Sequence, residues 1–112
     1  MKNVENKKMT VAVEQYDEAT KSIVTVNAET TYFEVFYESC KRPAQKEGGF
    51  TWEMIEKINR IKKVYETAKT KVGEKIKVED ADFEFIKERV LSNTWSTFDE
   101  NLLDLKNYIE KL

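Results

Sequence analysis

The chain has 112 residues, a length typical of a single domain with one hydrophobic core. Hydrophobic residues make up 40% of it and aromatic residues 12%, which argues against a wholly disordered chain. Its 19 basic and 21 acidic residues give a formal net charge of −2, spread over both halves, so we expect no duplex nucleic acid as a partner.

Several residue types needed for common chemistry are missing or single. The chain has no histidine, which excludes serine–histidine or cysteine–histidine relays and histidine-based zinc sites. Cys40 is the only cysteine, and its aromatic surroundings predict a buried thiol in a reducing compartment. The apolar runs are too short to span a membrane, and residues 1–8 lack the apolar segment of a signal peptide. We therefore predict a cytoplasmic protein without a membrane partner.

The first predicted element is a β-hairpin at residues 9–28. Residues 10–16 and 23–26 are rich in β-branched and aromatic side chains, as strands are, and residues 17–22 are typical of a turn. Residues 1–8 are polar, and we predict that they are flexible. Because an isolated hairpin is only marginally stable in water, this one needs helices, a third strand or another subunit to pack against.

The segment 29–42 fits two structures. Thr31 and Glu34 have the spacing of a helix capping box, and four side chains follow at helical spacing, namely Phe33, Phe36, Tyr37 and Cys40. Residues 30–37 nevertheless have the composition of a strand. We favour a helix, because Pro43 and a polar stretch end it, and a strand remains the alternative.

Two helices and a short extended segment are predicted next. Thr51 is a good N-cap for a helix whose apolar stripe comprises Met54, Ile55, Ile58, Ile61, Tyr65 and Ala68. Residues 75–78 alternate between basic and apolar side chains, which indicates a short extended segment. Asp80 is predicted to cap the second helix, and residues 92–93 to end it; one face of this helix carries Phe83, Ile86 and Val90.

The last predicted helix begins with a capping box at Thr97 to Glu100. Its apolar side chains repeat at coiled-coil spacing, namely Phe98, Leu102, Leu105, Ile109 and Leu112. Leu103 and Tyr108 lie off that stripe, where we expect them to reach a second helix. Together these elements predict one α+β domain over residues 1–112, with an N-terminal β-hairpin followed by three or four short helices. Residues 29–112 are then mainly helical, and we expect a homo-oligomer.

Two clusters are candidate ligand sites. Four carboxylates could in principle hold a divalent cation (Glu79, Asp80, Asp82 and Glu84), but they lack a calcium loop's spacing and stand where a helix dipole favours acids. We therefore predict no metal and no cofactor. The adjacent glycines before the helix at Thr51 are a weak phosphate-binding signal, and a simple loop is favoured. An anionic ligand, if bound, is expected at Gly48, Gly49, Phe50, Trp52, Arg60 and Lys63.

The remaining candidates favour structural roles over catalysis. Trp52 and Trp95 have faces that stack on nucleobases, but both stand beside predicted helix starts, where we favour packing. The basic residues of the middle segment are interrupted by acids, as on a solvated helix face. No carboxylate pair stands out as an acid–base couple. The sequence therefore predicts a protein that is not an enzyme.

Residues 46–112 contain several short patterns. They are the start Gly48-Gly49-Phe50-Thr51, then Met54 and Arg60-Ile61, the segment from Val78 to Ile86, and Trp95. Together these patterns resemble a group of small phage and prophage proteins of unknown function. In that group a "GGF-S/T" helix start precedes an "LEDADYEFLK"-type segment and a tryptophan. Val78 stands where the group typically has leucine, and Asn59-Arg60 replaces a more basic pair. These differences argue against a shared charged site. Because the function of the group is unknown, the resemblance implies no catalytic residues.

The resemblance implies phage origin, and small phage proteins of this kind act by stoichiometric binding. We expect a non-enzymatic binding protein directed at a host factor in the host cytoplasm. Its partner is then a host protein or a small nucleotide, and in the second case the protein is a counter-defence factor that sequesters a nucleotide signal. The alternative is a virion or assembly component.

Overall fold

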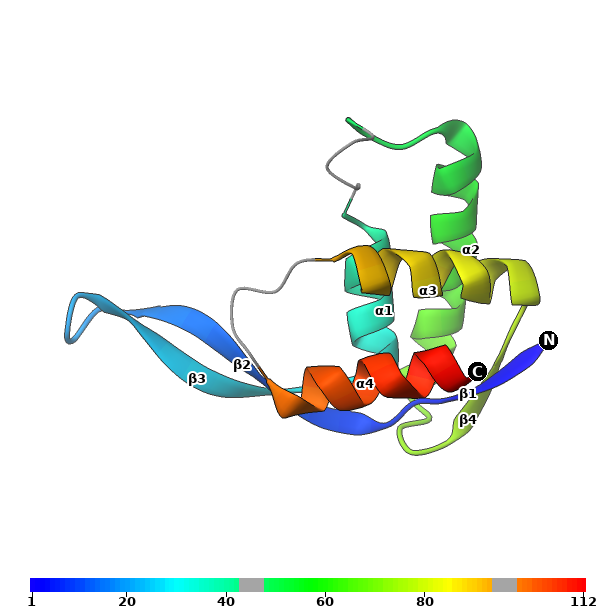
Figure 1. The fold of residues 1–112 in the computed structure, drawn as a ribbon. Coiled ribbons are helices and arrows are strands. Elements are labelled where there is room, and N and C mark those ends of the chain that lie inside the picture. Colours follow the sequence, from blue (N-terminus) through cyan, green and yellow to red (C-terminus); the bar gives the residue numbers. More distant parts are fainter. Residues whose placement is uncertain (43–47, 94–98) are drawn as a thin grey trace.

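A computed structural model describes residues 1–42, 48–93 and 99–112, and its helices and strands confirm the α+β class. The elements in chain order are β1 (Lys2–Glu5), β2 (Lys8–Asp17), β3 (Ser22–Thr31), α1 (Tyr32–Cys40), α2 (Trp52–Ala68), β4 (Lys75–Val78), α3 (Asp80–Ser92) and α4 (Glu100–Lys111). The helices gather at one end of the molecule, and the β2–β3 hairpin projects from them (Figure 1). The described part thus contains four helices, within the predicted number.

The β2–β3 hairpin is confirmed, and its strands are longer than predicted. The antiparallel ladder runs from the pair Lys8 and Thr31 to the pair Asp17 and Ser22, with Val13 opposite Val26. Lys21, the last residue of the turn, has a φ of 53°, a left-handed conformation that non-glycine residues adopt mainly in turns. The hairpin gives the molecule a longest extent of 47 Å and a radius of gyration of 14.9 Å, against about 13 Å for a compact domain of this length.

The ambiguous segment 29–42 divides between the two predicted structures. Strand β3 continues to Thr31, and helix α1 spans Tyr32–Cys40, so the helix prediction is wrong for residues 29–31 and 41–42 and confirmed for residues 32–40. The Thr31 hydroxyl accepts a hydrogen bond from the Glu34 amide at 3.3 Å, as an N-cap does. The Glu34 carboxylate accepts from the Thr30 hydroxyl instead of closing the box at the Thr31 amide. Cys40 is fully buried, as predicted.

The N-terminal segment is ordered, contrary to our prediction for residues 1–8. Strand β1 pairs antiparallel with β4, with Val4 opposite Ile76, and Val4 is fully buried. Asn6 is also fully buried, and its side chain donates to the Ala68 carbonyl and accepts from the Phe33 amide. The polar Asn6 side chain is stable in this buried position because its nitrogen and its oxygen both have hydrogen-bond partners. The short extended segment predicted at residues 75–78 is confirmed as β4.

Helix α2 begins as predicted. The Thr51 hydroxyl accepts a hydrogen bond from the Met54 amide at 3.2 Å. The predicted stripe is confirmed for Ile61 and Ala68, which are buried, and three further members pack partly against the core, namely Met54, Ile58 and Tyr65. Ile55 does not belong to it, because 43% of its surface is exposed.

Helix α3 differs from the prediction at its first residue. Asp80 is the first helical residue and not the cap; Glu79 occupies the N-cap without a side-chain capping hydrogen bond. The predicted apolar face is confirmed, since Phe83, Ile86 and Val90 are buried.

Helix α4 begins after Asp99, whose carboxylate accepts from the Asn101 amide at 2.8 Å. The predicted start at residues 97–98 lies outside the described residues. Leu105 and Ile109 are buried, as the stripe predicts, while Leu103 is 47% exposed. Tyr108 contacts its own domain, because its hydroxyl accepts from the Glu5 amide at 2.8 Å.

The core lies where the four helices meet the small β1–β4 sheet. Its most deeply buried large side chains are Phe36, Phe83, Ile86, Leu105 and Ile109. Helices α1 and α3 pack closely, and α4 runs along the base of the hairpin (Figure 1). Among the described residues, no helix is long and apolar enough to cross a lipid bilayer.

Candidate functional site

The residues put forward for anion binding do not converge on one point. Gly48 and Gly49, with φ values of 64° and 156°, precede helix α2, and Trp52 is its first residue with 81% of its surface exposed. Arg60 comes eight residues after Trp52, and Lys63 comes eleven residues after Trp52. This spacing places them roughly 12 and 16 Å further along the helix axis. The prediction that Trp52 packs against the domain is wrong, and Trp95 lies outside the described residues.

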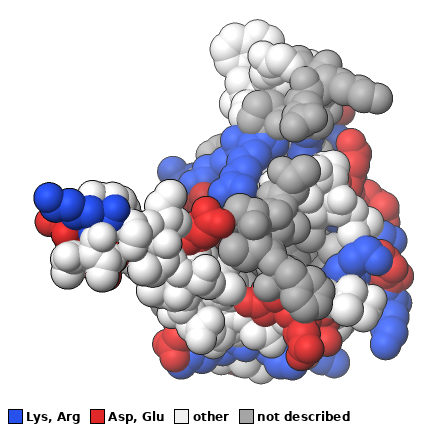
Figure 2. Space-filling view, turned by 60° about the vertical axis from the view of Figure 1, so that its left-hand side comes forward, with Lys and Arg blue, Asp and Glu red and all other residues white. Residues whose placement is uncertain are grey.

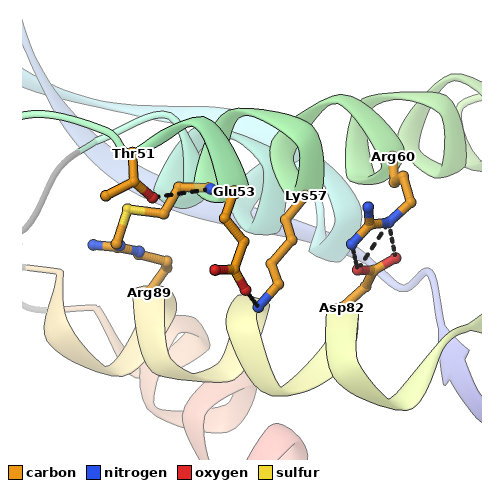
Figure 3. A network of polar contacts seen from close by, with 7 residues as sticks. Thr51, Glu53, Lys57, Arg60, Asp82 and Arg89 are labelled. Carbon is orange, nitrogen blue, oxygen red and sulfur yellow. Dashed lines mark hydrogen bonds and ion pairs between the residues drawn. The ribbon is translucent and has the colours of Figure 1, made fainter.

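Arg60 already has a partner inside the domain. Its guanidinium donates to both oxygens of the Asp82 carboxylate, at 3.0 and 3.3 Å, and Asp82 is only 3% exposed (Figure 3). This ion pair raises the pKa of Arg60 further above its ordinary value. Because breaking the pair would leave a buried carboxylate without its cation, Arg60 is poorly placed to hold an external phosphate.

The acidic cluster at the start of α3 is divided among different partners. Asp82 pairs with Arg60, and Asp80 lies 3.1 Å from the N-terminal amine of Met1. In the part of the chain that the structure describes, no three carboxylates or thiols are grouped as metal ligands.

A polar network that the sequence did not reveal joins α2 to α3. Glu53 and Lys57 form an ion pair on α2, and Arg89 of α3 reaches the same interface (Figure 3). Arg89 is 2% exposed, donates to the Met54 sulfur at 3.6 Å, and lies 4.9 Å from the centre of the Phe85 ring. The cation–π contact and the sulfur contact help to hold the charge in the interior. The contact of Arg89 with Met54 and the pair of Arg60 with Asp82 join α2 to α3.

Cys40 is the one thiol of the chain, and it faces the interior. Burial raises its pKa to about 12, although the nearby Arg89 cation acts in the opposite direction. Because the thiolate is the nucleophilic form, burial and the raised pKa both lower the reactivity expected of Cys40 at neutral pH.

A concave surface with an apolar lining lies between the hairpin and helix α1. It is a groove of about 270 Å³. Its apolar floor is formed by Val11, Val13, Ala28 and Val35. Its polar lining comprises Glu29, Thr30, Glu34, Glu38, Ser39, Arg42 and Asn93. The lining residues include three carboxylates and one guanidinium. Lys8 and Lys41, outside the lining, each pair with one of the carboxylates.

Local pairing positions the carboxylates of the groove. Glu34 and Glu38 are one turn apart on α1, and both are exposed. Glu38 pairs with Lys41 at 2.8 Å and Glu29 with Lys8 at 3.4 Å, while Glu34 accepts from the Thr30 hydroxyl at 2.9 Å. Such exposed pairs contribute little free energy, so a binding partner's cations can replace them at small cost. The groove is therefore suited to a positively charged ligand.

None of the groove residues was predicted from the sequence to bind a ligand; Glu34 was named only as part of a helix capping box. The glutamates on α1 have the spacing of an ordinary solvated helix face, and the valines on β2 have that of an ordinary strand. What brings them together is the turn of the chain at Thr31, where β3 passes directly into α1. The available signal was the alternation of Val11 and Val13 beside a helix whose outward side is acidic.

Comparisons with known proteins found no relative of this chain. No protein-family model matches the chain, and searches of curated proteins and of solved structures return no match.

Proposed function

We propose that this chain is a non-catalytic, phage-encoded binding protein that acts on a host protein, and that the groove between the hairpin and α1 holds the partner. The single observation that carries the proposal is the chemistry of this groove, an apolar floor bordered by Glu29, Glu34 and Glu38. The resemblance of residues 46–112 to small phage proteins supports the phage origin. The groove offers shape and charge, which are the means of stoichiometric binding.

The size of the groove indicates what it takes. Pockets that enclose a drug-sized ligand have roughly 300–1,000 Å³. At about 270 Å³, this one is suited to one or two side chains of a protein segment. The matching segment carries an apolar side chain for the valine floor, with a Lys or Arg on either side for the carboxylates. A segment of this kind would be ordered as it binds.

Sequestration of a small nucleotide signal is the second form of the proposal. Its support is the exposed Trp52 beside the two glycines, since an indole face stacks on a nucleobase. The geometry favours the protein partner, because Arg60 is held by Asp82 and the groove would repel phosphates. Native mass spectrometry of the protein with guanine and adenine cyclic dinucleotides tests the nucleotide form directly, and a retained nucleotide would replace the protein-partner form.

Fluorescence polarisation with labelled peptides tests the groove. The probes are an alternating Lys-Val hexapeptide and an alternating Glu-Val hexapeptide of the same length. We expect the basic peptide to bind, more weakly as salt rises, and the acidic peptide not to bind. The variant Glu34→Lys/Glu38→Lys is expected to weaken the basic peptide at least tenfold.

The matched control is Glu84→Lys/Glu88→Lys, which changes the net charge by the same amount on exposed positions one turn apart on α3. It is expected to retain most of the affinity. Equal loss in both variants would show that the attraction is a property of the whole molecule and would contradict the groove proposal, as would equal binding of the acidic peptide.

The alternative function is a virion or assembly component. The observation that favours it is the long, exposed edge of β3, since strand edges join subunits. Mass spectrometry of purified particles and of infected-cell cytoplasm separates the two proposals. A fixed copy number in the particles supports the structural role, and the cytoplasmic fraction alone supports host-directed binding.

A further inference from the structure

The two outer edges of the hairpin differ in what covers them. On β2, the Asp99 carboxylate accepts from the Ala12 amide and the Asn101 side chain donates to the Thr10 carbonyl, both at 2.6 Å. The N-terminus of α4 thus covers the base of this edge. These two hydrogen bonds also show that Thr10 and Ala12 direct their backbone groups away from β3.

The same alternation fixes which groups of β3 face outward. The Tyr32 amide donates to the Lys7 carbonyl at 2.9 Å, so even-numbered residues of β3 face β2. In an antiparallel ladder alternate residues then direct both backbone groups to the other side. Those are Ile23, Thr25, Asn27 and Glu29, all with exposed side chains, and no described residue hydrogen-bonds to these outward groups.

This edge lacks the features that keep strand edges from pairing. Natural edges are protected by lysine, proline, bulges or short length. Strand β3 has ten residues, SIVTVNAETT, with Glu29 as its one charge and no Lys or Pro. The flank of the hairpin between its tip and the body is largely uncharged on the face seen in Figure 2.

We propose that β3 pairs antiparallel with β3 of a second copy, around a two-fold axis at Val26. Ile23 then lies opposite Glu29 of the second copy, and Thr25 lies opposite its Asn27. The proposal commits to a second copy because the edge is complementary to itself. It rests on the strand edge and not on the groove, and the two surfaces share Glu29, which lines the groove and also lies on this edge.

The register follows from the sequence of β3. Centring the axis at Val26 is the arrangement that pairs all four outward-facing residues. The charged Glu29 meets an isoleucine, so no like charges stand opposite each other. Val24 lies opposite Ala28 and Val26 opposite its own copy, which continues the apolar face that Val13 begins. The result is a four-stranded sheet, in which each hairpin gains the partner that a two-stranded ribbon lacks.

Light scattering coupled to size exclusion measures the mass, and we expect two chains at micromolar concentration. Thr25→Pro removes an outward amide, so it deletes two hydrogen bonds of the symmetric interface. We expect its dissociation constant to rise about 30-fold, from about 1 kcal/mol for each net hydrogen bond.

Glu14→Pro is the matched control for this variant. Glu14 lies directly opposite Thr25 in the hairpin, and it also directs its amide outward, toward the other edge. The two prolines therefore disturb the same ladder position, and circular dichroism checks that both variants fold. Glu14→Pro is expected to leave the dimer unchanged.

Disulfide trapping tests the register. Across the axis, Val26 and its copy form a non-hydrogen-bonded pair with Cα atoms about 4.5 Å apart, within the range that a disulfide spans. Val26→Cys is therefore expected to cross-link two chains on mild oxidation. Val24→Cys is the control, because the two copies of residue 24 stand four residues apart, or roughly 13 Å. The buried Cys40 does not compete.

Three results would overturn the inference. A measured mass of one chain across the micromolar range would show that the interface does not form. If Glu14→Pro weakens the dimer as much as Thr25→Pro does, the interface does not lie on the β3 edge. Faster cross-linking of Val24→Cys than of Val26→Cys excludes the register centred at Val26.

Discussion

The helical body and the projecting hairpin are held together in different ways. In the body, Phe36, Phe83 and Ile109 are each at most 1% exposed and come from three different helices. At the tip of the hairpin, Tyr16 is 58% and Ile23 68% exposed, although they lie directly opposite each other. The hairpin beyond its base depends on its own ladder, whereas the body depends on contacts between distant segments. The two regions should therefore open with different free energies.

The largest expected effect is the loss of the body. Leu105→Asp places a carboxylate at a position that is 1% exposed, without a cation to pair with it. We expect it to cost at least about 4 kcal/mol and to unfold the chain, as seen by circular dichroism. Leu103→Asp, at a 47% exposed position of the same helix, is the control and should change stability little. A folded Leu105→Asp variant would show that α4 is not part of the core.

Removing a buried polar group should have the next largest effect. Asn6→Ala leaves the Ala68 carbonyl and the Phe33 amide without their partner in the interior. We expect a loss of about 3 kcal/mol in the free energy of unfolding, measured by urea denaturation. Asn3→Ala, at an exposed position of β1, is the matched control. Equal losses would mean that Asn6 contributes no more than a surface residue.

Alkaline pH should weaken the body through Cys40. Its pKa is raised from 9.0 to about 12 in the folded state, so the folded thiol keeps a proton that the unfolded thiol loses. This contribution is complete below pH 9 and is lost as the pH rises toward 12, by about 1.4 kcal/mol for each unit. Cys40→Ala lacks the linkage, so the difference in stability between wild type and variant should shrink over that range. A constant difference would contradict the burial of the thiol.

The smallest effect is expected at the hairpin tip. Tyr16→Ala removes one member of an exposed cross-strand pair, and we expect a loss of about 0.5 kcal/mol or less. Hydrogen exchange sharpens the comparison. Amides of β2 and β3 near the tip should exchange faster than those of α3. A loss above about 2 kcal/mol in the monomeric state would mean that the tip packs on the body.

Much of the fold could be predicted from the sequence, because local rules fix those elements. The alternation in residues 10–16 and 23–26 was enough for the hairpin, and Thr51 was enough for the start of α2. The segment 29–42 was ambiguous because its first residues obey strand rules and the rest obey helix rules. The error at Asp80 was one residue, which is within the range where capping rules lose their resolution.

The candidate site was far less predictable. The residues expected to bind an anion were chosen for their spacing in the sequence. In the folded chain, Arg60 forms an ion pair with Asp82 instead. The groove depends on how the hairpin is placed against α1, and its glutamates and valines carry no distinctive local pattern. A site assembled from ordinary residues becomes visible only when the chain is folded.

The sequence by itself determined the α+β class, the hairpin, the start of α2 and the burial of Cys40, because each follows from propensity or periodicity within a few residues. Only the tertiary structure decided that β1 pairs with β4 across some seventy residues, and that Asn6 and Asp82 are buried. It also decided which hairpin edge α4 covers and which edge stays open. The physical reason is that pairing and burial are properties of distant segments in contact, and no short window of sequence contains both partners.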